Sequence, residues 1–150
     1  MSFPLPSAMC RALDLAAEAA RAGEVPVGAV VICDGEIIGE GANRTRRDRD
    51  PTAHAEIVAI RAACTVLQTD RLTGCSLWVT LEPCAMCAGA IAHARLDRLI
   101  YGAPDIKGGG VDHGARVFAQ PTCHHRPDVL GGVGESAATA LLKDFFALLR

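Results

Sequence analysis

The stretch VGAVVICDGEIIGEG, residues 27–41, decides the fold class of this sequence. Residues 27–33 form an uninterrupted apolar run, as expected of a buried strand. Asp34-Gly35 follows this run and precedes a second strand-like segment over 36–41. An Asp-Gly pair between two such segments favours the two-residue turn of a β-hairpin. The stretch therefore predicts two antiparallel strands joined by a tight turn.

Helices and strands alternate after this hairpin. Apolar spacing, with glycine and proline at the breaks, predicts helices over 7–22, 52–64, 84–95 and 135–149, strands over 76–80 and 98–101, and a long loop over 103–127. A hairpin followed by such alternation predicts an α/β fold with a mixed sheet covered by helices. The length of 150 residues fits one domain spanning residues 1–150.

The composition excludes several classes of protein. Half of the residues are apolar and the mean hydropathy is +0.23, which excludes a disordered or fibrous chain. Fifteen Lys and Arg against seventeen Asp and Glu give a net charge of −2, so a general basic coat for nucleic acid is absent. Nucleic-acid binding would need a local patch, and the dense basic run is Arg44, Arg46, Arg47 and Arg49.

The sequence leads us to expect a cytoplasmic protein with no membrane contact. No uncharged apolar run approaches the roughly 18 residues of a membrane span. The first ten residues contain no Lys or Arg, which is untypical of a signal peptide. The seven cysteines are therefore expected to be reduced thiols. Four of them are interpreted as small buried apolar side chains: Cys10, Cys33, Cys64 and Cys75.

Two short motifs carry the ligands of a metal site. His54-Ala55-Glu56 opens the second predicted helix, and Pro83-Cys84-Ala85-Met86-Cys87 opens the third. Cys84 and Cys87, three residues apart, lie on one helix face, and the helix N-terminus favours their thiolate form. Thiolate and imidazole together suit zinc. With His54 the protein supplies three ligands, which leaves the open fourth position of a catalytic zinc site.

Glu56 cannot share a lateral helix face with His54, because the two are only two residues apart. They converge only near the tip of the helix, where the turn-forming residues 50–52 place them. We therefore interpret Glu56 as a catalytic base beside the zinc-activated water. A Cys-x-x-Cys pair alone is often a redox or structural motif, and His-x-Glu alone carries little information. Their combination, each at a helix start, favours the zinc site.

The combination of His-x-Glu and Pro-Cys-x-x-Cys is the signature of zinc-dependent base deaminases. Beyond the signature, the sequence resembles the bacterial tRNA-specific adenosine deaminases over nearly its whole length. The matching stretches are 25–30, 41–44, 50–57, 81–91, 101–103, Asp105, Lys107 and 144–146. The resemblance implies a three-layer α/β/α fold of the cytidine-deaminase type with a mixed sheet of about five strands. It also implies a homodimer that converts the wobble adenosine of a tRNA anticodon to inosine.

The resemblance also implies roles for individual residues. His54, Cys84 and Cys87 match the ligands of one Zn²⁺ per chain, and Glu56 matches the proton shuttle. For the RNA, Asn43 matches a residue that holds the flipped base, Asp105 and Lys107 match a loop that touches neighbouring nucleotides, and Phe146 matches a position flanking the anticodon. Five residues are candidates for contacts with the RNA backbone: Arg44, Arg46, Arg47, His125 and Arg150.

Three features depart from the family pattern. Residues 108–113 read Gly-Gly-Gly-Val-Asp-His where many members carry Thr-Gly-Ala. His124-His125-Arg126 stands in place of Asn-His-Arg, and the tail after Phe146 keeps one basic residue. Cys123 precedes these histidines and suggests a second metal cluster, but adjacent side chains rarely bind one ion well, so backbone or RNA contacts are favoured.

Two other functions remain open at this point. One is a deaminase of a free base or nucleoside such as guanine or cytosine, which would share the zinc signature. The other is a non-catalytic zinc-binding or RNA-binding module. Asn43-Arg44, Asp105 with Lys107, and Phe145-Phe146 favour the RNA-acting branch. An unliganded Glu56 beside the metal favours an enzyme over a structural site.

Overall fold

The computed structural model describes residues 4–149, and Arg150 lies outside the described residues. The centre is one sheet of five strands: β1 (Gly28–Cys33), β2 (Glu36–Ala42), β3 (Ser76–Leu81), β4 (Arg98–Ala103) and β5 (Asp128–Leu130). The strand order is β2-β1-β3-β4-β5, with β1 antiparallel to both neighbours and β3, β4 and β5 parallel. The predicted hairpin and mixed sheet are confirmed. The position of β5 was not predicted.

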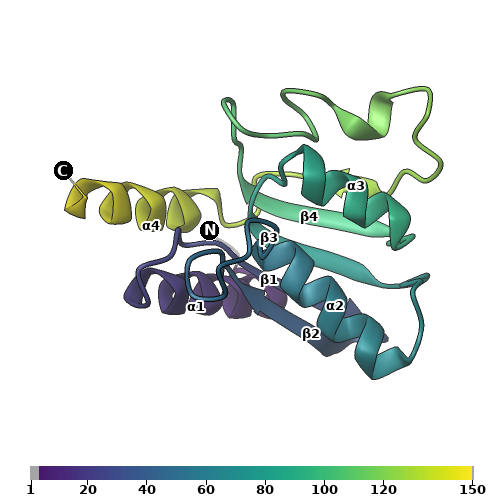
Figure 1. Ribbon diagram of the computed structural model, residues 1–150, viewed down its shortest axis with the longest axis horizontal. Coiled ribbons are helices and arrows are strands. Elements are labelled where there is room, and N and C mark those ends of the chain that lie inside the picture. Colours follow the sequence, from purple (N-terminus) through teal and green to yellow (C-terminus); the bar gives the residue numbers. More distant parts are fainter. Residues whose placement is uncertain (1–3, 150) are drawn as a thin grey trace.

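Four helices cover the sheet: α1 (Ser7–Arg21), α2 (Ala55–Leu67), α3 (Ala85–His93) and α4 (Glu135–Leu148). Helices α2 and α3 lie on one face, whereas α1 and α4 lie on the other, which gives three α/β/α layers (Figure 1). The last part of α4, in yellow, extends beyond the sheet. The long loop between β4 and β5 contains one short 3₁₀ helix, Val117–Ala119. None of the helices among the described residues is long and apolar enough to span a membrane.

The strand residues alternate between the two apolar layers. Ala29, Val31, Leu77 and Val79 face α2 and α3, whereas Val30 packs against α1 on the opposite face. This alternation follows from the two-residue period of a strand. Among the four cysteines interpreted as buried, Cys75 is buried and Cys33 and Cys64 are partly buried. The prediction for Cys10 is wrong, because Cys10 lies on the exposed side of α1.

Glycines in β2 allow α2 to lie close against the sheet. A Cβ atom on Gly41 would lie 2.2 Å from the carbonyl oxygen of Ala55, and one on Gly39 would lie 2.4 Å from that of Ala59. Real Cβ atoms do not approach backbone this closely, so both positions require glycine. Since Ala55 is the first residue of α2, this contact also fixes the height of the helix start above the sheet.

We expect Gly41→Ala to destabilise the protein by about 1–3 kcal/mol, because the helix must move away from the strand. Gly89→Ala is the matched control, since Gly89 lies inside α3 and a Cβ added there would meet no atom within 4 Å. Alanine has the higher helix propensity, so this control is expected to stabilise by about 0.5–1 kcal/mol. Urea unfolding measures both. Equal stability of the Gly41 variant and the parent would contradict the prediction.

Candidate metal centre and active site

The loops that precede α2 and α3 bring the predicted zinc ligands together at the starts of these helices. His54 is the N-cap of α2 and Cys84 is the N-cap of α3, and these two helix starts lie side by side. Both helices begin later than predicted. Helix α2 starts at residue 55 rather than 52, because Asp50 accepts hydrogen bonds from the backbone and hydroxyl of Thr52 and forms a turn there. His54 is therefore extended rather than helical, so its ring can face Cys84.

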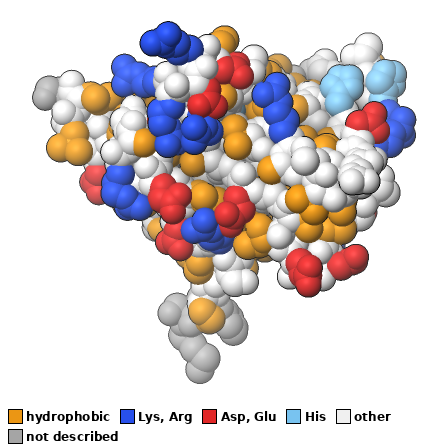
Figure 2. Space-filling view, turned by 60° about the horizontal axis from the view of Figure 1, so that its bottom comes forward, with side chains coloured by type: hydrophobic (Ala, Val, Ile, Leu, Met, Phe, Trp, Pro, Cys, Tyr) orange, Lys and Arg blue, Asp and Glu red, His pale blue; other side chains and the backbone are white. Residues whose placement is uncertain are grey.

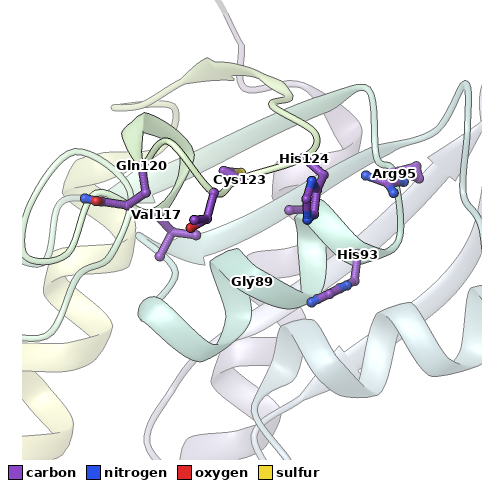
Figure 3. Close-up of a pocket in the computed structure, with 9 residues that line it drawn as sticks. Gly89, His93, Arg95, Val117, Gln120, Cys123 and His124 are labelled. Atoms are coloured by element: carbon purple, nitrogen blue, oxygen red, sulfur yellow. The ribbon is translucent and has the colours of Figure 1, made fainter.

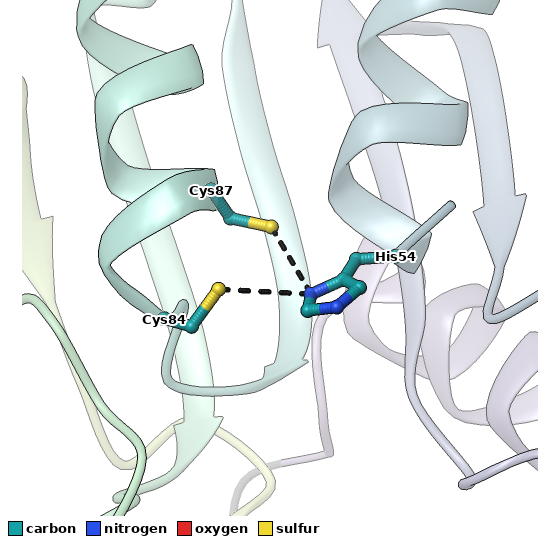
Figure 4. Close-up of side chains that lie close together, drawn as sticks. All are labelled: His54, Cys84 and Cys87. Carbon is teal, nitrogen blue, oxygen red and sulfur yellow. Dashed lines mark hydrogen bonds between the residues drawn. The ribbon is translucent and has the colours of Figure 1, made fainter. Parts of the chain in front are cut away.

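The distances among the three side chains fit one zinc ion. Nδ1 of His54 lies 3.6 Å from Sγ of Cys84 and 3.5 Å from Sγ of Cys87 (Figure 4). A tetrahedral centre with Zn–N of about 2.0 Å and Zn–S of about 2.3 Å separates such ligand atoms by about 3.5 Å. All three donor atoms lie within 4.8 Å of one another. The donor set, two sulfurs and one imidazole, also suits zinc.

The electrostatics of the pair favour a thiolate. The Cys87 thiol donates a hydrogen bond to Cys84, and this bond together with nearby His54 lowers the pKa of Cys84 to about 4. The same bond, with burial, raises the pKa of Cys87 above its ordinary value. One sulfur of the pair is thus already anionic at neutral pH. A cation placed between the three ligands would stabilise the second thiolate as well.

Glu56 lies in the first turn of α2 and points into the same site. It is 4% exposed, and burial raises the pKa of its carboxyl to about 7. It lines a cavity of about 250 Å³ together with His54 and Cys84. A carboxyl that titrates near neutral pH and borders a metal site can both accept and return a proton.

The cavity contains two of the predicted substrate residues, Asn43 and Asp105. Oδ1 of Asn43 accepts a hydrogen bond from the backbone N–H of Ala55 at 2.8 Å, and its Nδ2 donates to the carbonyl of Val25 at 3.1 Å. These two bonds fix the orientation of the amide and leave one N–H of Nδ2 for a ligand. Asp105 lines the cavity from the loop after β4.

The structure does not bring the other predicted substrate residues into this cavity. Lys107 is exposed two residues beyond Asp105. Phe146 is 45% exposed on α4, where it packs edge-on against Phe145 and lines a separate hollow. His125 bonds through Nε2 to the carbonyl of Leu96 at 2.7 Å, near the start of β4 and at the end of the sheet opposite the zinc ligands. Arg150 lies outside the described residues.

The basic run beside the cavity is largely paired within the protein. Nε of Arg44 donates to both carboxylate oxygens of Asp48, at 3.0 and 3.1 Å. Arg46 donates to the carbonyl of Gly23. Arg47 lies 3.6 Å from Glu24. On the face shown in Figure 2, basic side chains lie interspersed with acidic ones, so this face carries no continuous field of one sign. The run contributes less free positive charge than its sequence indicates.

Two buried carboxylates beside the site were not predicted. Glu82 lines the cavity, and Glu24 lies beneath the basic run. Burial raises the pKa of each carboxyl, but hydrogen bonds from loop backbone outweigh it, so both pKa values lie below the ordinary value. For Glu82 the one available signal is its position between apolar Leu81 and Pro83. Both carboxylates are therefore anionic at neutral pH.

Comparison with known proteins agrees with this geometry. Residues 5–103 match the cytidine and deoxycytidylate deaminase zinc-binding region, which includes all three ligands. The chain belongs to the cytidine and deoxycytidylate deaminase family. Together, the zinc-binding region and the His54, Cys84 and Cys87 site support one zinc per chain in this deaminase.

Among members of the deaminase family, the tRNA-specific adenosine deaminase of Agrobacterium fabrum is 55% identical over 135 residues, 90% of this chain and 89% of that protein. A solved structure of a tRNA:A34 deaminase is 54% identical with a TM-score of 0.90 and covers 91% of this chain and 99% of its own. A guanine deaminase from Nitrosomonas europaea is 26% identical with a TM-score of 0.81 over 98% and 87% of the two chains. The α/β/α fold of the family is thereby confirmed.

A further hollow lies beside α3. It is lined by His93, Cys123 and His124, among others, from α3 and the long loop (Figure 3). Within residues 4–149, His54, Cys84 and Cys87 form the one group of three or more His, Cys, Asp or Glu with metal-site spacing. Cys123 instead donates to the carbonyl of His125 at 3.2 Å. This bond and the bond from His125 to the carbonyl of Leu96 attach the loop to the backbone. The structure therefore agrees with the prediction of backbone contacts rather than a second metal.

Proposed function

We propose that this protein is a hydrolase that deaminates the wobble adenosine of a tRNA anticodon to inosine. One observation carries the proposal. The tripod of His54, Cys84 and Cys87 adjoins a cavity that His54, Cys84 and the buried Glu56 line, in a chain that is 55% identical, over 90% of its length, to a tRNA-specific adenosine deaminase. The glutamate supports an enzyme over a structural zinc module, because a structural site does not need a buried carboxylate that is not a metal ligand.

The residues of the cavity divide the chemistry between them. His54, Cys84 and Cys87 would hold zinc, which supplies a water whose pKa is lowered to roughly 7. Glu56 would take a proton from the attacking water and pass it to N1 of the adenine as the water oxygen bonds to C6. It would then move the remaining hydroxyl proton to the exocyclic nitrogen, so that the C6–N bond breaks, C6=O forms and ammonia leaves. The balanced reaction is adenosine plus water to inosine plus ammonia, so the protein needs no redox partner.

We assign the substrate contacts from position around the cavity. The free N–H of Asn43 would donate to an acceptor on the flipped base, and Asp105 would border the base on the other side. Exposed Arg46 directly follows Thr45 of the cavity lining, exposed Lys107 lies two residues beyond Asp105, and both would supply positive charge for phosphates. Arg44, Arg47, His125, Phe146 and Arg150 remain candidates for contacts further along the RNA.

We also propose that the protein acts as a homodimer in the cytoplasm. The family resemblance supports the dimer, and a tRNA substrate together with seven free cysteines supports the compartment. Light scattering on the purified zinc-loaded protein is expected to give about twice the chain mass of 15.7 kDa. A mass equal to one chain at micromolar concentration would contradict the dimer.

The substrate assay tests the function. We expect an anticodon stem-loop with adenosine at the wobble position to be deaminated, and free adenosine, cytidine and guanine at equal concentration to react far more slowly. The reason is that contacts with flanking nucleotides help to place C6 beside the activated water, so a truncated substrate loses rate as well as affinity. Inosine and ammonia release are measured for all four.

Two controls sharpen this assay. A stem-loop with guanosine at the wobble position is expected to bind but release no ammonia, and binding of both RNAs is expected to weaken as salt rises. Turnover of free guanine with none on the stem-loop would replace the proposal with the small-molecule alternative.

A further inference from the structure

Two buried carboxylates that the proposed reaction does not use lie under the two loops at the cavity. Glu82 directly follows β3, and Glu24 lies between α1 and β1. Each is 1% exposed. A buried charge is stable in a protein only where donors replace its water shell. The donors around each carboxylate therefore show what it holds in place.

Glu82 binds the loop that follows β4. Its Oε1 accepts the backbone N–H of Asp105 at 3.0 Å, and its Oε2 accepts the backbone N–H groups of Val111, Asp112 and His113 at 3.2, 3.0 and 3.1 Å. The His113 ring adds a contact from Nδ1 to Oε1 at 2.7 Å. All five donors come from residues 105–113, so this one carboxylate binds both ends of the segment.

The glycines of the loop permit this arrangement. A Cβ atom on Gly109 would lie 2.5 Å from Oε2 of Glu82, and one on Gly110 would lie 2.5 Å from the backbone nitrogen of Ala85. The N–H of Gly110 donates to the carbonyl of Pro83 at 2.8 Å. Gly109 and Gly110 thus allow the loop to lie against both the carboxylate and the start of α3.

Glu24 plays the same part under the other loop. Its Oε2 accepts the backbone N–H of Arg47 at 2.8 Å, and its Oε1 accepts the backbone N–H of Arg46 at 3.2 Å and the hydroxyl of Thr45 at 3.4 Å. Thr45 brings this loop to the cavity and Asp105 brings the loop after β4, so each loop forms a wall of the cavity. Each wall is therefore attached to one buried carboxylate.

We propose that Glu82 and Glu24 are positioning residues that hold the two walls of the cavity in the shape that receives the anticodon loop. This inference rests on the proposed function for its substrate, but the attachment itself is independent of it. The walls contact nucleotides around the reacting base rather than the reacting atoms. A loosened wall still contacts these nucleotides once the RNA is bound, but it must first be ordered, so the cost falls mainly on affinity and KM rises more than kcat falls.

Glu82→Gln and Glu24→Gln form a reciprocal test in the full-length, zinc-loaded protein. Glutamine keeps the size of the side chain, but its NH₂ group faces backbone N–H donors whichever way the amide turns. We expect amide exchange in 105–113 to accelerate at least about tenfold in Glu82→Gln while 44–48 stays unchanged, and the converse in Glu24→Gln. In each variant KM for the stem-loop is expected to rise about tenfold, with kcat within about threefold of the parent.

Zinc content and a milder pair of variants complete the test. His113→Ala removes one donor and is expected to accelerate exchange in 111–113, whereas His124→Ala, an exposed histidine of the same loop, leaves it unchanged. Unchanged exchange in the attached loop, equal acceleration in both loops, or loss of zinc would overturn the positioning role. A parent protein that is inactive on the stem-loop would overturn the proposed function alone, because the exchange pattern still decides the attachment.

Discussion

We expect Glu56→Gln to fold and keep its zinc, with a turnover rate about 10²–10⁴-fold below that of the parent. Glutamine has the size of glutamate, so the cavity keeps its shape, but an amide cannot accept a proton from the activated water. Glu56 is not one of the three metal-spaced donors, so its replacement leaves the tripod intact. Single-turnover deamination of the stem-loop under saturating enzyme isolates this step from binding.

Glu36→Gln is the matched control for this variant, because Glu36 is an exposed residue at the start of β2, remote in sequence from every zinc ligand. We expect it to keep the parent rate. Parent-like turnover in Glu56→Gln would remove the shuttle role. Loss of zinc from that variant would instead make Glu56 a ligand.

Cys87→Ser is expected to lose the zinc and the stability that zinc provides. Cys87 is fully buried, so a water molecule cannot take the place of its sulfur as a ligand. A serine hydroxyl is a poor zinc ligand. Binding to the native state alone stabilises it by about 4.1 kcal/mol when free metal is a thousand times the dissociation constant. We therefore expect a chelator to lower the unfolding temperature of the parent markedly and to leave that of Cys87→Ser unchanged.

Cys10→Ser provides the comparison, since Cys10 is an exposed cysteine of α1. It is expected to hold one zinc per chain by elemental analysis and to respond to chelator as the parent does. A Cys87→Ser protein that retains one zinc, or a parent whose unfolding ignores the chelator, would contradict the ligand assignment.

Features that depend on neighbouring residues were predictable from the sequence. The Asp34-Gly35 turn, the Cys-x-x-Cys pair and the His-x-Glu motif each span a few residues, so the hairpin and, from the two motifs combined, the three metal-spaced residues were predictable. Strand β5 is three exposed residues long and pairs only because β4 offers its edge, so no apolar pattern marks it. The start of α2 was predicted three residues early because the turn at Asp50 competes with the helix.

Interactions between distant parts of the chain were not predictable. Glu82 meets its partners 23–31 residues further along, and Glu24 meets Arg46 and Arg47 after 22 and 23. The sequence therefore suggested that the arginines are free to bind phosphates, whereas in the fold Arg44, Arg46 and Arg47 contact Asp48, Gly23 and Glu24. Burial of a carboxylate follows from loop packing, which residue type alone does not encode.

Asn43 limits how freely the specificity of this enzyme can be engineered. Its side-chain oxygen caps the first residue of the helix that carries Glu56, while its remaining N–H faces the cavity. Leaving this buried N–H without an acceptor costs about 1–3 kcal/mol. If Asn43 recognises the base as proposed, any substitution that changes this recognition also weakens the start of the helix that positions Glu56. Variants selected for a new base at residue 43 are expected to need a compensating stabilising change elsewhere before their activity can be judged.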